Sequence, residues 1–274
     1  MTSSTTANRK PVQALVALTY LVMIGTNFAA NALPLNGRRT GEVSDSYPSL
    51  FTPAGFTFSV WGVIYLLLGM HVLYQLGLFR GRPDTAADSA LLNRVGVLFS
   101  ISSLANTAWV FAWHYDHIGL SAVLVVVILV CLALIVGTLN RTDLTGRQRA
   151  YVGVPFSVYF GWTTVATIAN ITVLLVSLHW KGFGLSESMW ATVIVVVGMV
   201  IGTATMLRNR DIAYGLVLIW AYLGILLRQT SATDGFGGRY LNIIVAVMVA
   251  LVVFIVAEVA VMRRGQADRG TMHR

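Results

Sequence analysis

Eight stretches of the chain are each long and apolar enough to cross a lipid bilayer as a helix. A hydrocarbon core about 30 Å thick requires about 20 consecutive, mostly apolar residues per helix. The composition agrees, because only 11% of the residues are charged, whereas soluble proteins have roughly 25%. We therefore predict an all-α, polytopic membrane helix bundle of about eight transmembrane helices. They are expected at about residues 12–33, 54–79, 91–113, 118–139, 152–178, 188–207, 212–229 and 240–262.

A transmembrane β-barrel is the other fold that satisfies every backbone polar group in lipid. Its strands would place apolar residues at every second position over roughly ten residues. The run Leu124-Val-Val-Val-Ile-Leu-Val130 does not alternate in this way, which favours helices. Cysteine adds no covalent constraint, because the single Cys131 cannot form an intrachain disulfide.

The chain carries a net charge of +8, and its Lys and Arg residues lie mainly on one side of the predicted topology. They gather at the N-terminus, in the even-numbered loops and at the C-terminus, while the opposite loops contain Arg38, Arg39, Lys181, Arg228 and Arg239. The positive-inside rule then predicts a multi-pass protein of the cell membrane with both termini in the cytoplasm. Since this rule accounts for the charge, we expect the lipid bilayer as a partner and no nucleic acid.

A cleavable signal peptide is the alternative interpretation of the N-terminus. Arg9 and Lys10, the first apolar stretch and the small residues Ala30-Asn31-Ala32 follow one another as such a peptide requires. Because the apolar stretch is long for a signal peptide, we expect the first helix to be retained.

Three of the apolar stretches carry aromatic and small polar residues along one helical face. Asn106, Trp109 and Trp113 are spaced i, i+3 and i+7, which places them on the same side of a helix. Similar stripes recur in the second and fifth stretches and consist of Phe58, Trp61 and Tyr65, and of Trp162, Ala166 and Asn170. Three such faces can line one cavity, so we treat these nine residues as candidate ligand-binding residues. The alternative is that the stripes only pack helices together, with amides bridging between them.

Three motifs resemble those of a known membrane protein family. Pro53-Ala-Gly-Phe-Thr-Phe-Ser-Val-Trp-Gly-Val-Ile-Tyr65 is similar to Pro-x-x-Trp-x-Phe-x-x-Val-Trp-x-x-Leu-Tyr. Leu104-Ala-Asn-Thr-Ala-Trp-Val-Phe-Ala-Trp113 is similar to a Leu-Asn-x-x-Trp motif, and Trp162-Thr-Thr-Val-Ala-Thr-Ile-Ala-Asn170 to Trp-x-x-x-Ala-x-x-x-Asn. In this order, the motifs resemble the TspO/MBR family of tryptophan-rich sensory proteins, which are related to the mitochondrial translocator protein.

The resemblance covers about residues 12–178 and has local departures. Phe56 stands where the family has tryptophan, two residues instead of three separate Phe58 from Trp61, and Pro155 lies seven residues before Trp162 instead of four. The family fold has five helices. We therefore predict a TspO-like five-helix bundle over residues 1–178, followed by three additional transmembrane helices and a cytoplasmic tail over residues 179–274.

The resemblance implies a pocket for flat apolar molecules, such as protoporphyrin and other tetrapyrroles, sterols or synthetic aromatic compounds. Stacking on the five candidate Trp and Tyr side chains would hold such a ligand, and Asn106 and Asn170 would orient it or each other. We therefore expect a sensor or carrier that requires no cofactor and takes a porphyrin or haem-related molecule as its ligand.

Two other functions stay open from the sequence. One is a small secondary transporter of an apolar or amphipathic solute, although no internal repeat is evident. The other is an intramembrane enzyme, for which His71 and Glu258 would be the acid and base, although we expect His71 to bridge two helices and Glu258 to reach the interface. No phosphate-binding loop, zinc motif or nucleophile elbow occurs, so we expect no catalytic and no metal-ligating residues.

A Gly-x-x-x-Gly pattern at Gly198 and Gly202 permits close approach of another helix. It is consistent with a homodimer and equally with internal packing of the last three helices.

Overall fold

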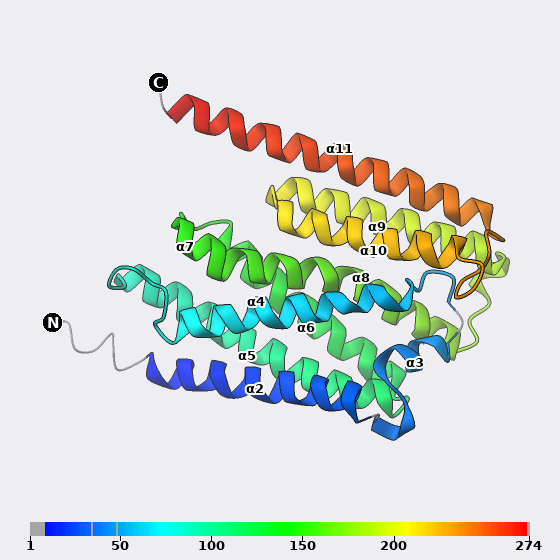
Figure 1. Ribbon diagram of the computed structural model, residues 1–274, viewed down its shortest axis with the longest axis horizontal. Helices are drawn as coiled ribbons and strands as arrows, with labels where there is room; N and C mark the ends of the chain where they lie inside the picture. Colours follow the sequence, from blue (N-terminus) through cyan, green and yellow to red (C-terminus); the bar gives the residue numbers. More distant parts are fainter. Residues whose placement is uncertain (1–8, 34, 48, 273–274) are drawn as a thin grey trace. The chain divides into compact units, whose positions relative to one another are not determined.

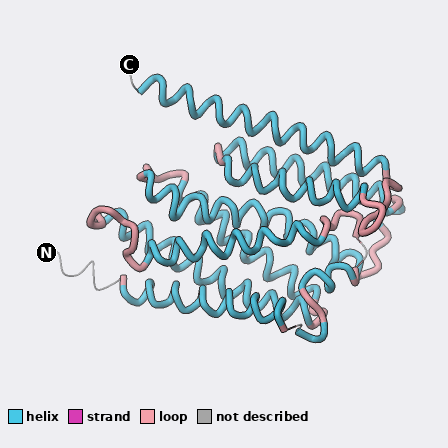
Figure 2. Tube along the Cα trace, in the orientation of Figure 1, coloured by secondary structure: helices cyan, strands magenta, loops and turns pink. Residues whose placement is uncertain are grey.

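The computed structural model describes residues 9–33, 35–47 and 49–272, and within these ranges it contains helices and no strand. Eight of the described helical segments are long and apolar enough to cross a membrane, which confirms the predicted all-α, polytopic bundle. Loops and short helices connect them (Figures 1 and 2). The long helices are α2 (Lys10–Ala32), α4 (Val60–Gln75), α5 (Ala86–His114), α6 (Ile118–Leu139), α8 (Val154–Ser177), α9 (Glu187–Asn209), α10 (Ile212–Thr230) and α11 (Leu241–Met272).

Six short helices lie in the connections or extend a long helix. They are η1 (Leu35–Gly37), α3 (Thr40–Asp45), η2 (Gly55–Ser59), α7 (Gly146–Gln148), η3 (Arg149–Gly153) and η4 (Gly182–Gly184). Three of them lengthen membrane spans, because η2 leads directly into α4, and α7 with η3 leads into α8. The connection between α2 and α4 thus contains η1, α3 and η2.

The chain forms two compact units, and the predicted division after residue 178 stays a prediction. Unit 1 consists of Met1–Val43 and Val60–Thr163, and unit 2 of Ser44–Ser59 and Thr164–Arg274. The second half of α8 belongs to unit 2, where the Tyr214 hydroxyl lies 3.2 Å from the Thr164 hydroxyl. The segment Ser44–Ser59 belongs there because it bonds to α10, as described below.

Helix α5 is the centre of unit 1, where it packs against both α2 and α6. It begins with a capping box, in which the Asp88 amide donates to the Thr85 hydroxyl (3.1 Å) and the Thr85 amide donates to the Asp88 carboxylate (2.9 Å). Such a box satisfies two of the free amides at a helix start. Helices α2 and α4 are joined by the Tyr20 hydroxyl, which donates to the Tyr65 carbonyl over 2.8 Å.

In unit 2, α11 packs along α9 and α10 (Figure 1). The fully buried Tyr222 of α10 donates a hydrogen bond to the Val195 carbonyl of α9 over 2.9 Å, and its ring meets the edge of Phe254 of α11 at 4.9 Å between centroids. The small face formed by Gly198 and Gly202 lies against these helices, since added Cβ atoms there would meet side chains of α10 and α11. Internal packing therefore occupies the Gly-x-x-x-Gly face.

The segment Ser44–Ser59 is bonded to α10 along its length. The Ala54 amide donates to the Gly224 carbonyl over 3.0 Å, and the Gln229 side chain donates to the Leu50 carbonyl over 2.6 Å. A Cβ atom on Gly224 would lie 2.7 Å from Thr57 Cγ2 and 2.9 Å from Thr57 Cβ. Glycine is therefore needed at this position for η2 to approach α10.

Replacing Gly224 by alanine tests this close approach. We expect Gly224→Ala to lower the free energy of unfolding by about 1–3 kcal/mol, the usual cost of overpacking, because the added Cβ atom would meet the fully buried Thr57 side chain. Gly137→Ala in α6 is the matched control, since nothing lies within 4 Å of the added atom and alanine favours a helix. Thermal unfolding in detergent, followed by circular dichroism, should separate the two variants. Equal stabilities would contradict the packing of η2 on α10.

Candidate functional site

An aromatic cluster in unit 1 is centred on Trp61 of α4. Its ring lies 5.5 Å from the ring of Tyr65, 6.5 Å from Trp109, 6.0 Å from Tyr159 and 6.1 Å from Trp162, measured between centroids. These distances fall in the range of favourable aromatic contacts. Trp113 extends the cluster, because it stacks on Trp109 with centroids 5.6 Å apart and ring planes 17° from parallel. We call these six side chains from α4, α5 and α8 the aromatic cluster.

Helical periodicity explains how three helices contribute to the aromatic cluster. Trp61 and Tyr65 are four residues apart on α4, and Trp109 and Trp113 are four apart on α5, so each pair shares a face. The ring planes of the α4 pair lie 20° apart and those of the α5 pair 17° apart. Both pairs therefore stack along their helices, as the sequence stripes predict.

A chain of buried hydrogen bonds lies beside these rings. The Asn27 amide nitrogen donates to Asn106 Oδ1 over 2.7 Å, and Asn106 Nδ2 donates to the Tyr159 hydroxyl over 3.2 Å. All three side chains are buried. Since an unbonded amide in an apolar interior is costly, these two hydrogen bonds fix α2, α5 and α8 relative to one another. Asn106 thus has protein partners for both ends of its side chain.

The sequence analysis missed Tyr159 and Asn27, although a signal for each was present. Tyr159 precedes Trp162 by three residues and therefore shares its helical face. Asn27 is an amide within the first apolar span, about residues 12–33, and amides in membrane helices commonly bond to another helix. Only the three-dimensional structure shows that both meet Asn106.

The two stacked indoles of α5 use their N–H groups differently. Trp113 Nε1 donates to the Thr40 carbonyl over 3.1 Å and so holds α3 against the end of α5. Trp109 Nε1 is buried and has no hydrogen-bond partner among the residues that the structure describes. Leaving a buried donor unpaired costs about 1–3 kcal/mol. An acceptor placed next to Trp109 would therefore gain a strong hydrogen bond.

Six of the nine candidate residues are thus brought together in unit 1. They are Trp61, Tyr65, Asn106, Trp109, Trp113 and Trp162. The remaining three, Phe58, Ala166 and Asn170, belong to unit 2. Phe58 lies in η2, and Asn170 is a buried side chain in the second half of α8. Ligand contact by these three residues stays a prediction.

His71 is a packed residue of unit 1, as expected. It is fully buried, its ring meets Phe156 edge-on at 4.7 Å between centroids, and its Nδ1 lies 3.2 Å from the Tyr151 carbonyl of η3. The expected hydrogen bond between helical segments is therefore confirmed.

Glu258 belongs to unit 2, and the prediction that it reaches the membrane interface is wrong. Its side chain is 5% exposed, and both carboxyl oxygens are buried without a hydrogen-bond partner in the described part of the chain. The side chain is buried because it is directed towards α10, where its carboxyl group lies against Gly215; a Cβ atom on Gly215 would collide with it. His71 and Glu258, the pair considered for acid–base chemistry, belong to different units.

Comparison with protein families gives one match. A family model described as TSPO-like protein matches residues 13–260. No curated protein and no solved structure matches the chain. The matched range includes the last three spans, so the resemblance extends beyond the predicted limit of residue 178.

Removing the Asn106 side chain tests whether the hydrogen bonds from Asn27 through Asn106 to Tyr159 stabilise the fold. We expect Asn106→Ala to lower the free energy of unfolding by about 1–2 kcal/mol, since two bonds between membrane helices are lost. Ser103→Ala on the same helix is the control, because the Ser103 hydroxyl is buried without a hydrogen-bond partner among the described residues, and its removal should leave the free energy of unfolding unchanged or raise it by up to about 1–3 kcal/mol. Unfolding in detergent would measure both. An Asn106→Ala variant as stable as Ser103→Ala would refute the bridging role.

Proposed function

The chain belongs to the TSPO-like family, and from this premise we propose that the aromatic cluster of unit 1 binds a flat apolar molecule, such as a porphyrin. The proposal is supported by the composition of the cluster. Its six large aromatic side chains come from α4, α5 and α8. Each aromatic contact contributes about 0.5–1.5 kcal/mol beyond the burial of apolar area, so a planar ligand that meets several rings would be held without any charged group.

The unpaired N–H of Trp109 is the observation that carries the proposal. Packing alone accounts for stacked rings between helices, but it gives no reason for a buried donor without an acceptor. A ligand with a carboxylate, carbonyl or hydroxyl oxygen would supply that acceptor. The neighbouring Trp113 shows that an indole on this face can find an acceptor, because it bonds to Thr40.

The aromatic cluster also favours binding over catalysis. Its polar groups are indoles and phenols, and the Asn106 amide lies beside them; all of these hydrogen-bond but are poorly suited to acid–base chemistry near neutral pH. A sensor and a carrier both begin with the same binding step, and we propose that step for this chain. The ligand is then a regulatory molecule or cargo, and no cofactor is needed.

We further propose that the protein lies in the cell membrane with both termini in the cytoplasm. The charge distribution supports this orientation, since Arg9, Arg80, Arg82 and Arg147 meet at one end of unit 1 and cationic residues favour the cytoplasmic side. A green fluorescent protein fused to the C-terminus should fluoresce, and alkaline phosphatase at the same site should be inactive. An active phosphatase fusion would overturn the orientation.

Titration with protoporphyrin in detergent, followed by tryptophan quenching, tests the binding proposal. We expect Trp61→Ala to raise the dissociation constant about tenfold or more, because the central ring of the aromatic cluster is lost. Trp109→Phe keeps an aromatic ring but removes the N–H group, and it should raise the constant about two- to tenfold.

The matched control is Trp180→Phe, which removes an indole that contacts Phe183 and Trp190 in unit 2. It should leave the dissociation constant unchanged while lowering the total fluorescence. If Trp61→Ala and Trp109→Phe bind protoporphyrin as tightly as the parent protein, the binding site lies elsewhere.

A further inference from the structure

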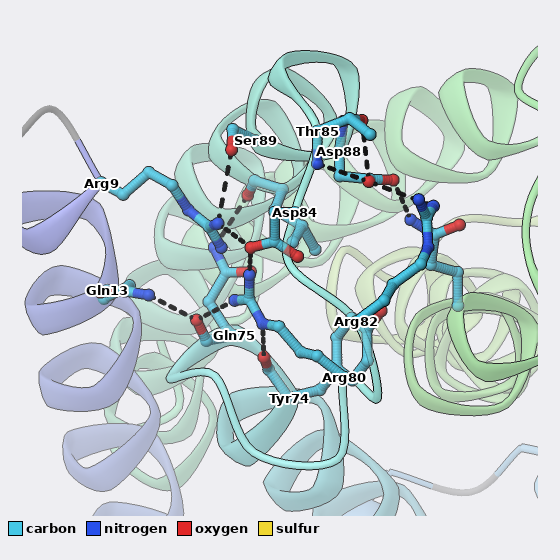
Figure 3. A network of polar contacts seen from close by, with 12 residues as sticks. Arg9, Gln13, Tyr74, Gln75, Arg80, Arg82, Asp84, Thr85, Asp88 and Ser89 are labelled. Carbon is cyan, nitrogen blue, oxygen red and sulfur yellow. Dashed lines mark hydrogen bonds and ion pairs between the residues drawn. The ribbon is translucent and has the colours of Figure 1, made fainter. Parts of the chain in front are cut away.

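A second group of polar residues lies at one end of unit 1 (Figure 3). Arg9 and Arg80 both form ion pairs with Asp84, and Arg82 pairs with Asp88 over 3.3 Å. They are joined by Arg147, whose guanidinium donates to the Phe79 carbonyl over 2.8 Å and lies against Gly81. We call these four arginines the guanidinium cluster. Three of these arginines pair with the two carboxylates and Arg147 lies beside the Phe79–Gly81 turn, which leaves an excess of two positive charges in the group.

The two carboxylates have little capacity left for further cations. Asp88 accepts hydrogen bonds from the Thr85 amide (2.9 Å), the Thr85 hydroxyl (2.8 Å) and the Gln148 side chain (2.6 Å) in addition to its contact with Arg82. Asp84 is shared by two guanidinium groups. The excess charge therefore has no counterion among these carboxylates.

Arg9 shows most clearly that an acceptor is missing. The residue is 8% exposed, and its Nη1 bonds to Asp84 and lies 3.4 Å from the Ser89 hydroxyl. Its Nε and Nη2 atoms are buried without a hydrogen-bond partner among the described residues. Burial lowers the pKa of the Arg9 and Arg80 guanidinium groups, but arginine keeps its charge in proteins. Unpaired donors on a buried cation are among the costliest polar groups.

The guanidinium cluster lies where the membrane spans begin and end. Helix α2 begins at Lys10, α4 ends at Gln75, α5 begins at Ala86, and α7 begins at Gly146. We therefore expect the four arginines of the guanidinium cluster at the level of the lipid headgroups rather than in the hydrocarbon. Basic pockets between helix ends at this depth commonly bind phosphorylated headgroups.

We propose that the guanidinium cluster is a binding site for a phosphate group, and that in the bilayer this group belongs to an anionic phospholipid. Arg9 would donate from Nε and Nη2, which form one edge of the guanidinium fork that matches two oxygens of a phosphate. Arg82, whose side chain is 53% exposed, would reach the same group from the solvent side. The site uses none of the residues of the aromatic cluster, so it is independent of porphyrin binding.

Native mass spectrometry of the detergent-solubilised protein tests the proposal with phosphatidylglycerol and phosphatidylcholine as probes. The parent should bind phosphatidylglycerol more tightly than phosphatidylcholine. Arg9→Gln should weaken phosphatidylglycerol binding about tenfold or more, since charged hydrogen bonds are lost, and Arg82→Gln should weaken it several-fold. Arg141→Gln is the matched control, because it removes the same charge from an exposed loop residue between α6 and α7 and should leave the affinity unchanged.

A folding check and a competition experiment complete the test of the phosphate site. Circular dichroism checks folding, and Arg9→Gln should fold because Arg80 still pairs with Asp84; if it does not fold, the exposed Arg82→Gln carries the test alone. Competition by inorganic phosphate would show that the site takes free phosphate as well as the headgroup, whereas no competition would restrict it to the lipid. The proposal is overturned if phosphatidylglycerol binds no better than phosphatidylcholine, or if Arg82→Gln and a folded Arg9→Gln bind it as the parent does.

Discussion

Lipid hydrocarbon offers no hydrogen bonds, so every polar group inside the membrane must find its partner within the protein or in a bound molecule. This constraint forces the backbone of the chain into helices and explains where its polar side chains lie. Asn27, Asn106 and Tyr159 bond to one another across three helices, and the Trp113 indole bonds to the Thr40 carbonyl. A buried donor without an acceptor is costly in this medium, and Trp109 Nε1, which lies among the rings of the aromatic cluster, is such a donor among the described residues.

Helix α5 connects the two sites that we propose. It carries Asp88 and Ser89 of the polar group near its start and Trp109 and Trp113 of the aromatic cluster near its end. Trp109 follows Asp88 by 21 positions, which separates the sites by roughly 30 Å at 1.5 Å per residue. One site thus lies at headgroup level, where phosphate is present, and the other lies far from it along the helix, where stacking and single hydrogen bonds hold a ligand. Their chemistries differ because their surroundings differ.

Local patterns in the sequence were sufficient to predict the membrane spans and the stripes, because span length and helical periodicity depend only on neighbouring residues. They placed Trp61, Trp109 and Trp162 on faces that the structure brings together. Contacts between distant segments could not be read in this way. The approach of η2 to Gly224 depends on how the segment before α4 packs on α10. The burial of Glu258 depends on the rotation of α11 about its axis, which an almost wholly apolar helix does not reveal.

The central claim is that the aromatic cluster of unit 1 is a binding site rather than only a packing interface. A structure of the protein with protoporphyrin bound in a lipid environment tests it most directly. We expect the plane of the ligand in contact with Trp61 and Trp109, at roughly 3.5–4 Å between carbon atoms, and one of its oxygen atoms within about 3 Å of Trp109 Nε1. A bound ligand that touches neither indole, with the six rings packed as they are in its absence, would contradict the claim.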